Sequence, residues 1–333
     1  MRIVVTVDTE ADGQWEHGRP LATANVAAWP RFQELCRRHG VRPTYLITSE
    51  IAEDPEAVAF LRPRAAAGAL EVGSHLHPWT TPPFAEAPGL RRNDPDHAYP
   101  CHLEPDLLRA KLETLTGQVA QVAGARPTSY RAGRFGLDAA GARLLAELGY
   151  NVDSSVTPFI TWVANAGRPG RGGGPDFRRH DAYPFRVAGT GSPGLVEVPV
   201  TILPTYSVTR RVSWLREHWQ ARPVRLGRRA MRVLPRPQPL WLRPRPEYAL
   251  GDLQALLLEA ERAHLPFAVF MFHSSELLAG ASPYRPAQGD VDVLLRLLDE
   301  LFAWSRDRGH SFATLSEAGR ILAAYERLPQ KDL

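Results

Sequence analysis

The sequence predicts an α/β fold in which parallel strands alternate with helices. Short apolar runs alternate with helical patterns about seven or eight times along the chain of 333 residues. Polar residues of the kinds found in functional sites follow several of these runs directly, as they do at the carboxyl-end mouth of a parallel barrel. The composition, 44% hydrophobic and 23% charged, is that of a globular protein.

Strands are expected where short apolar, often β-branched, runs occur, at 3–7, 44–48, 70–77, 128–132, 150–156, 195–203, 267–272 and 312–315. Helices are expected at 24–38, 55–67, 107–122, 138–148, 253–264 and 291–306, with a last helix after the final strand. Gly40 suits a helix C-cap and Asp138 an N-cap. We expect one domain over 1–333, with an insertion at about 165–247 rich in Gly, Pro and Arg.

Charge and cysteine usage narrow the function classes. The net charge is only +4 and the basic segment has no recognised nucleic-acid-binding pattern, so no nucleic-acid partner is expected. The arginines of 205–247 suit either an anionic partner or a solvated insertion. Cys36 and Cys101 are too few for a disulfide framework or a thiolate metal site.

The amino terminus and the hydropathy pattern bear on location. The first residues lack the apolar stretch of a signal peptide, and no run of about 18 apolar residues occurs in the chain. We therefore expect a cytoplasmic protein with no transmembrane segment. The oligomeric state stays open.

Two pairs of polar residues at strand ends predict a metal centre. Asp8 and Glu10 follow the first strand, and His75 and His77 end the third. Residues i and i+2 of an extended chain point to the same side, so each pair can converge on one site. Two imidazoles and a carboxylate suit zinc and leave room for water, as catalytic sites do. Taken alone, each pair also fits solvated loop acids or hydrogen-bonded core histidines.

Three further polar residues end other strands. Arg131, Asp153 and His273 also have structural interpretations, as a surface ion pair, a turn residue and the end of a core strand. Their order along the chain, after the acids and the paired histidines, favours one shared site at the mouth of a barrel.

The segments that carry these residues resemble a known family. TVDTE, EVGSHLHPWTTPP, YRAGRFG, GYNVDSS and FHSSE are similar to motifs of the polysaccharide deacetylase superfamily (NodB-like, carbohydrate esterase family 4), and more narrowly of its WalW-like branch, which is associated with lipopolysaccharide biosynthesis. The resemblance spans about 3–315 and is poorest at 165–246. It implies a distorted (β/α)7 barrel and metal-dependent removal of an acetyl group from an amino sugar.

The resemblance also implies roles for catalytic residues. Asp8 matches the general base, Arg131 the arginine that orients it, and His273 the general acid. Asp153 matches the acid of the fourth motif, which would orient the histidine or the arginine.

The implied metal ligands are Glu10, His75 and His77, with zinc as the expected ion. Glu10 stands where the family usually has aspartate, and His77 follows His75 by two residues instead of four, so His102 is a reserve ligand. Trp79 and Tyr130 are expected to contact a carbohydrate or glycoconjugate substrate.

Other functions use the same residues. The chain could hydrolyse another C–N bond, such as that of a cyclic amide, or act as a glycosidase through Asp8 and Glu10. It could also be a non-catalytic sugar-binding relative whose shortened histidine motif holds no metal.

Overall fold

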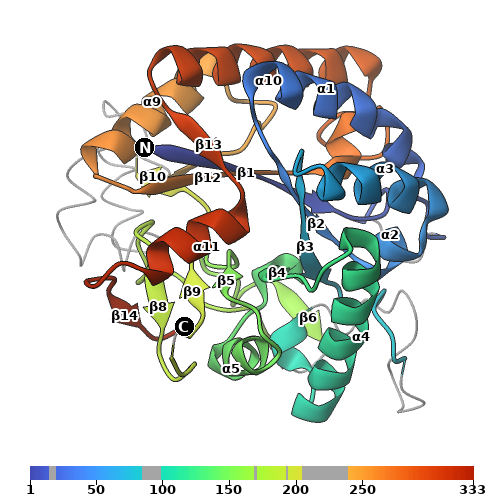
Figure 1. The fold of residues 1–333 in the computed structure, drawn as a ribbon, viewed down its shortest axis with the longest axis vertical. Coiled ribbons are helices and arrows are strands. Elements are labelled where there is room, and N and C mark those ends of the chain that lie inside the picture. The colour runs from blue at the N-terminus through green and yellow to red at the C-terminus, as the bar shows by residue number, and fades with distance from the viewer. Residues whose placement is uncertain (15–19, 85–98, 169–170, 193, 205–238) are drawn as a thin grey trace.

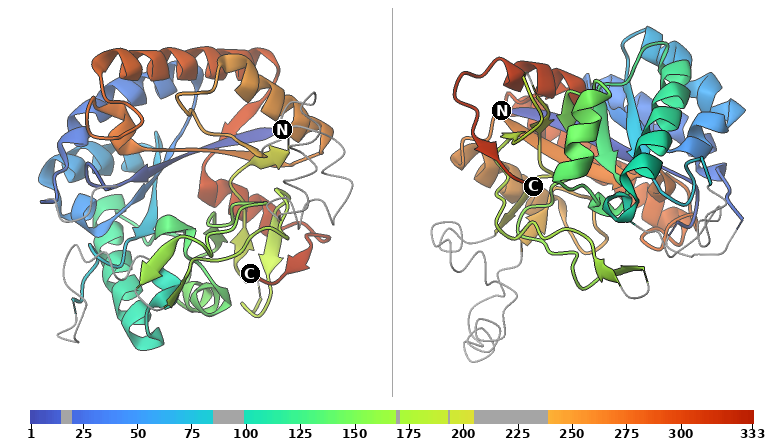
Figure 2. Two further views of the ribbon diagram at one scale, coloured as in Figure 1. Left: turned by 180° about the vertical axis from the view of Figure 1, so that it is seen from behind. Right: turned by 90° about the horizontal axis from the view of Figure 1, so that it is seen from below.

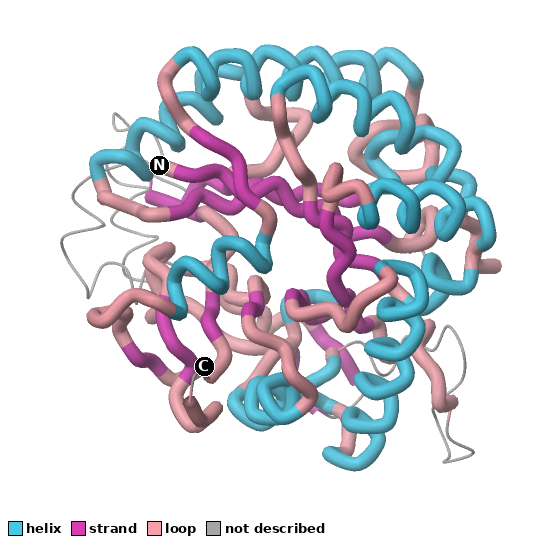
Figure 3. The backbone as a smooth tube through the Cα atoms, in the orientation of Figure 1, coloured by secondary structure: helices cyan, strands magenta, loops and turns pink. Residues whose placement is uncertain are grey.

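The computed structural model of the chain describes residues 1–14, 20–84, 99–168, 171–192, 194–204 and 239–333. Most of the arginine-rich stretch lies outside these residues, and so does the question of whether its arginines meet an anionic partner or solvent. Within the described part, a curved sheet is surrounded by helices (Figures 1 and 3). The expected α/β class is therefore confirmed.

The main sheet has ten strands, in the order β12-β1-β2-β3-β4-β5-β9-β8-β14, with β13 beside the start of β1. The pairs from β12 to β9 are parallel, and β8 is antiparallel to β9. The strands are β1 (Arg2–Thr9), β2 (Thr44–Ile47), β3 (Glu71–Leu76), β4 (Ser129–Ala132), β5 (Val152–Asp153), β8 (Phe185–Val187), β9 (Val196–Glu197), β12 (Phe267–His273), β13 (Ser311–Ala313) and β14 (Gln330–Lys331). The parallel arrangement brings the carboxyl ends of β1, β3, β4 and β12 to one rim.

Isolated hydrogen bonds bridge the gap between β9 and β12. The N–H of Thr201 donates to the carbonyl of Val269 at 3.2 Å, and its carbonyl accepts from the N–H of Leu242 at 2.8 Å. The carbonyl of Leu242 in turn accepts from the N–H of Met271 at 3.1 Å. The wall is thus closed without a regular ladder, which gives the distorted (β/α)7-type barrel that the sequence predicts.

Apolar side chains fill both sides of the barrel wall. Inside, Val4, Leu46 and Val269 pack with α11 (Leu315–Ala323). A Cβ atom at Gly319 would lie 2.6 Å from Cβ of Val152, so glycine lets α11 approach β5 closely. The outward faces of the strands pack against the surrounding helices.

The outer helices begin and end close to where the sequence predicts, except α2 (Ser49–Glu53), which was not predicted. They are α1 (Trp29–His39), α2, α3 (Pro55–Ala66), α4 (Pro105–Ala123), α5 (Ala139–Glu147), α9 (Leu250–Arg262) and α10 (Gln288–Asp307). Gly40 ends α1 at a φ of 68°, and the Asp138 side chain caps α5. The helices α1 and α10, distant in sequence, lie side by side on the outside (Figures 1 and 2).

The stretch expected as an insertion at 165–247 also contributes to the barrel. It contains β8 and β9 of the main sheet, besides the hairpin of β6 (Ala166–Arg168) and β7 (Arg171–Gly173). It also holds the antiparallel pair β10 (Ile202–Pro204) and β11 (Pro239–Trp241), which flanks residues 205–238. Of the helices that the structure describes, none combines the length and apolar character needed to cross a membrane.

Candidate active site

Glu10, His75 and His77 meet at the rim of the barrel. Each offers a ligand atom, and these atoms all lie within 4.8 Å of one another. Oε2 of Glu10 is 3.2 Å from Nε2 of His77 and 3.9 Å from Nε2 of His75. All three residues are buried. The structure thus brings together the three residues that the sequence suggests as metal ligands.

The local backbone explains why the two histidines converge. His75 and His77 are two residues apart at the end of β3, so both side chains point to the inside of the barrel. Gly133, after β4, leaves room for the second ring, because a Cβ atom there would lie 2.4 Å from Cδ2 of His77. On its other side, His77 stacks on Trp79 with ring centroids 4.3 Å apart.

A hydrogen bond sets the orientation of the His75 ring. Nδ1 of His75 lies 2.9 Å from the carbonyl oxygen of Arg131, which can only accept, so Nδ1 carries the proton. The lone pair is then on Nε2, which faces Glu10. Burial lowers the pKa of His75 although Asp8 opposes this, so the ring is suited to bind a metal in its neutral form.

Asp8 and Arg131 form a buried ion pair behind these ligands. The distance from Nη1 of Arg131 to Oδ1 of Asp8 is 2.5 Å. Burial alone would raise the pKa of Asp8, but the charge of Arg131, with help from the nearby histidines, outweighs burial and lowers it. Arg131 is itself held by Ser154, whose carbonyl accepts from Nε at 2.7 Å and whose hydroxyl oxygen accepts from Nη2 at 3.0 Å. Asp8 is therefore kept ionised and fixed in place.

The electrostatics of Glu10 support a cation site. Burial raises the pKa of Glu10 well above its usual range, and the carboxylates of Asp8 and Glu50 raise it further. Glu50 lies in α2 and accepts a hydrogen bond from the N–H of Ala11 at 3.2 Å. Burial keeps Glu10 from ionising unless positive charge lies close to it, and a divalent ion held by Glu10 and the two histidines would supply that charge.

His273 completes the group from the other side of β1. It is the register partner of Asp8 in the parallel pair β1–β12. Its Nε2 lies 3.9 Å from Oε1 of Glu10, and its side chain, 16% exposed, is more accessible than that of Glu10, which is 4% exposed. An ionised acid, three imidazoles and an acidic ligand therefore share one partly open site.

Two residues expected at the site lie on the other face of the sheet. The first is Asp153 of β5, whose neighbour Val152 belongs to the inner core. Because side chains alternate along a strand, that of Asp153 points outward, as does that of its register partner Glu197. Asp153 accepts from the hydroxyl of Ser155 at 2.7 Å and has an electrostatic interaction with Arg131, but it has no described contact with His273. Tyr130, next to Arg131, likewise points outward and packs against Tyr150. The structure thus does not bring Asp153 or Tyr130 to the ligands.

Of two other suggested residues, Trp79 contacts a ligand and His102 does not join the ligand group. Trp79 supports His77 and donates from Nε1 to Oε1 of Gln14 at 3.0 Å. Nε2 of His102 lies 3.2 Å from the carbonyl of Gly173, and His102 is not part of the ligand group among the described residues.

Sequence reasoning missed two residues beside His273. Nδ1 of His273 lies 3.4 Å from Oε1 of Glu276 and 3.2 Å from Nη2 of Arg243. Glu276 could have been found from its position three residues after His273, at the start of the short helix Ser274–Leu277. Arg243 gives no such signal, because it is one of many arginines in its segment.

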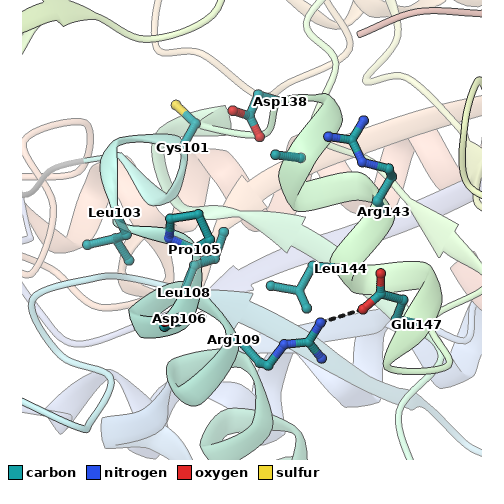
Figure 4. A pocket seen from close by; sticks show the side chains of 11 residues that line it. Cys101, Leu103, Pro105, Asp106, Leu108, Arg109, Asp138, Arg143, Leu144 and Glu147 are labelled. Carbon is teal, nitrogen blue, oxygen red and sulfur yellow. Dashed lines mark hydrogen bonds and ion pairs between the residues drawn. The ribbon is translucent and has the colours of Figure 1, made fainter.

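A separate surface pocket of about 220 Å³ lies between α4 and α5 and holds none of the site residues (Figure 4). Its walls carry Cys101, Asp138 and an ion pair between Arg109 and Glu147. Burial, assisted by the charge of Asp138, raises the pKa of Cys101 to about 12, so this thiol is not a nucleophile near neutral pH.

Comparison with solved structures agrees with the fold. A candidate polysaccharide deacetylase from Mycobacterium smegmatis matches over 99% of this chain and 93% of its own, with 17% identity and a TM-score of 0.56. A candidate glycoside hydrolase/deacetylase from Parabacteroides distasonis matches over 98% and 72%, with 13% identity and a TM-score of 0.57. The PuuE allantoinase matches over 98% and 90%, with 13% identity and a TM-score of 0.54. No protein-family model and no curated protein matches the sequence.

These likenesses show that the chain has the fold of polysaccharide deacetylases, as its motifs imply. The narrower resemblance to the WalW-like branch stays a prediction.

Proposed function

We propose that this protein is a metal-dependent deacetylase that removes the acetyl group from an N-acetylated amino sugar or glycoconjugate. The observation that carries the proposal is the convergence of Glu10, His75 and His77 beside the ion pair of Asp8 and Arg131. The motifs in which these residues stand, and the shared fold, support the same activity.

The three ligands suit a divalent ion, with zinc favoured by two imidazoles and one carboxylate. Such an ion would supply Lewis-acid catalysis, polarising the scissile carbonyl and acidifying water. The contribution of the chain itself is to hold the ligands in the right protonation state. His75 does so through its bond to the carbonyl of Arg131.

Asp8 would act as the general base. Its low pKa keeps it ionised, and Arg131 holds one of its oxygens. The other oxygen would accept the proton of the attacking water as the C–O bond forms at the acetyl carbon. Arg131 thereby orients the base without touching the substrate.

His273 would act as the general acid. When the C–N bond breaks, the leaving nitrogen needs a proton, because an amide anion is a poor leaving group. Nε2 of His273 lies on the side of Glu10 away from β3 and is part of the more exposed side of the site. The products would be acetate and a free amino sugar, in keeping with the proposed place in lipopolysaccharide or surface polysaccharide synthesis.

The experiment that tests the proposal measures metal content and acetate release together. The purified chain should bind about one zinc per molecule and release acetate from N-acetylated amino-sugar oligomers. Asp8→Asn should lose activity by about 100-fold or more and keep its metal. His77→Asn should lose the metal, whereas the control His102→Asn should keep it. Wild-type protein that binds no divalent ion would refute the proposal and favour a sugar-binding protein.

The same assay separates the other hydrolases. The likeness to the PuuE allantoinase makes a cyclic amide the second substrate to examine. Ring opening of allantoin without acetate release would favour that class, and new reducing ends without acetate would favour a glycosidase.

A further inference from the structure

The surroundings of His273 contain a buried cluster that the catalytic scheme does not use. Glu276 is fully buried, and Arg243 and Arg285 are only 6% and 3% exposed. Nη2 of Arg243 donates to Oε1 of Glu276 at 3.1 Å, and Nη2 of Arg285 lies 4.0 Å from its Oε2. The guanidinium of Arg243 also lies over the ring of Tyr284, 4.6 Å from its centroid. Both cations are thus anchored on one carboxylate.

The same carboxylate is tied to His273 at two points. Oε1 of Glu276 accepts from the backbone N–H of His273 at 3.2 Å and lies 3.4 Å from its Nδ1. The pKa of Glu276 is lowered, because the hydrogen bond to His273 and the charge of Arg243 outweigh the effect of burial. Glu276 is therefore an ionised acceptor at a fixed distance from the ring.

An acceptor, Oε1 of Glu276, and a donor, Nη2 of Arg243, compete for Nδ1 of His273. If Nδ1 carries a proton, it donates to Glu276. If Nδ1 is bare, it accepts from Nη2 of Arg243 at 3.2 Å, and the proton of a neutral ring is on Nε2. After His273 has donated the proton on Nε2 as a general acid, the ring keeps only the proton on Nδ1. Of the two arrangements, only the hydrogen bond from Nδ1 to Glu276 stabilises that form of the ring.

We propose that Glu276 is a positioning residue that fixes His273 in the tautomer protonated on Nδ1, with Nε2 directed into the site, and that Arg243 holds Glu276 in place. Both the choice of tautomer and its catalytic consequence rest on the proposed deacetylase function, although the tautomer itself can be measured without any assay of activity. This role differs from the one expected for Asp153, whose side chain lies on the other face of the sheet.

The test is a nitrogen NMR spectrum of the ¹⁵N-labelled full chain with zinc supplied, at a pH where His273 is neutral. The ring signals are assigned by their loss in His273→Gln. In the wild type, Nδ1 should show the shift of a protonated ring nitrogen and Nε2 should not. Glu276→Ala should move the proton to Nε2, because Arg243 then donates to Nδ1. Glu276→Gln keeps an acceptor and should largely restore the wild-type tautomer.

Glu261 offers a matched control, because it forms a similar group with a histidine and an arginine elsewhere in the molecule. It lies 2.5 Å from Nε2 of His310 and 2.8 Å from Nη2 of Arg308. Glu261→Ala should leave the signals of His273 unchanged. A wild-type ring protonated on Nε2 would overturn the proposal, and this measurement does not depend on the folding of any variant at position 276.

Kinetics give a second readout. Glu276→Ala should lower kcat about 10- to 100-fold with little change in KM, and Glu276→Gln should recover part of the loss. If the wild type releases no acetate, the proposed function fails while the tautomer result still decides the role of Glu276. If acetate is released and kcat of Glu276→Ala is unchanged, the positioning role fails alone.

Discussion

Arg131 and His75 are register partners on β4 and β3, and Arg131 contributes to the site through both its backbone and its side chain. Its carbonyl oxygen lies 2.9 Å from Nδ1 of His75, while its guanidinium holds Asp8 at 2.5 Å. The orientation of a metal ligand and the ionisation of the proposed base therefore depend on the placement of a single strand residue. Ser154 of the next segment fixes that residue in turn.

Replacing Arg131 by methionine should destabilise the protein strongly. The change leaves Asp8 buried without its cation, and breaking one side of a buried ion pair costs about 3–5 kcal/mol. Urea unfolding measures the loss. The double variant Asp8→Asn/Arg131→Met should recover part of it, because no unpaired carboxylate remains. A loss under about 1 kcal/mol in Arg131→Met would contradict the buried pair.

Gly133→Ala should weaken metal binding without touching a ligand. The new Cβ atom would lie 2.4 Å from the His77 ring and 2.5 Å from the carbonyl oxygen of Leu76, so the ring must move. We expect at least about a tenfold loss of zinc affinity by titration calorimetry, as for changes that disturb ligand orientation. The matched control is Gly117→Ala in α4, where a Cβ atom meets nothing within 4 Å. Equal affinity in both variants would show that Gly133 does not position His77.

The amine of Lys111 should make stability depend on pH above neutrality. It lies in α4 and donates to the carbonyls of Pro78, Thr81 and Pro83, just after His77. Burial lowers the pKa of Lys111 to about 8, against about 10.4 for an unperturbed lysine. Between these values the unfolded chain binds the proton more tightly, so this residue makes the free energy of unfolding rise with pH.

The measurement compares wild type with Lys111→Met by urea unfolding from pH 7 to pH 10.5. The free energy of unfolding of the wild type minus that of Lys111→Met should increase from about pH 8 upward. A difference that is flat or falls over this range would mean that the three carbonyls retain the proton and that the pKa is not lowered.

The sequence was most informative where the period of two could be applied within one strand. Asp8 and Glu10, and likewise His75 and His77, are separated by two residues, so their shared direction needs no knowledge of the sheet. The strands before them are long and apolar enough to be located well. The alternation of strands and helices predicts parallel strands, and the carboxyl ends of parallel strands lie at one rim, so both pairs could be assigned to the same rim.

The face on which Asp153 lies could not be predicted in this way. Its strand has only two residues, Val152 and Asp153, and their directions depend on the register with β4 and β9. That register is set by the packing of the inner core, in which Val152 meets Gly319 of α11. The closeness of Arg243 to His273 is equally non-local, because it depends on the bond between Leu242 and Met271 that closes the barrel.

The pairing of β10 with β11 gives the molecule a place where its length can change. Pro204 and Pro239 are register partners, so the two residues that flank 205–238 lie side by side. A turn of a few residues could therefore join the two strands in place of 205–238, since the entropy of closing a loop varies slowly with its length. A protein engineer can use these neighbouring ends to shorten the chain and to find out what residues 205–238 contribute.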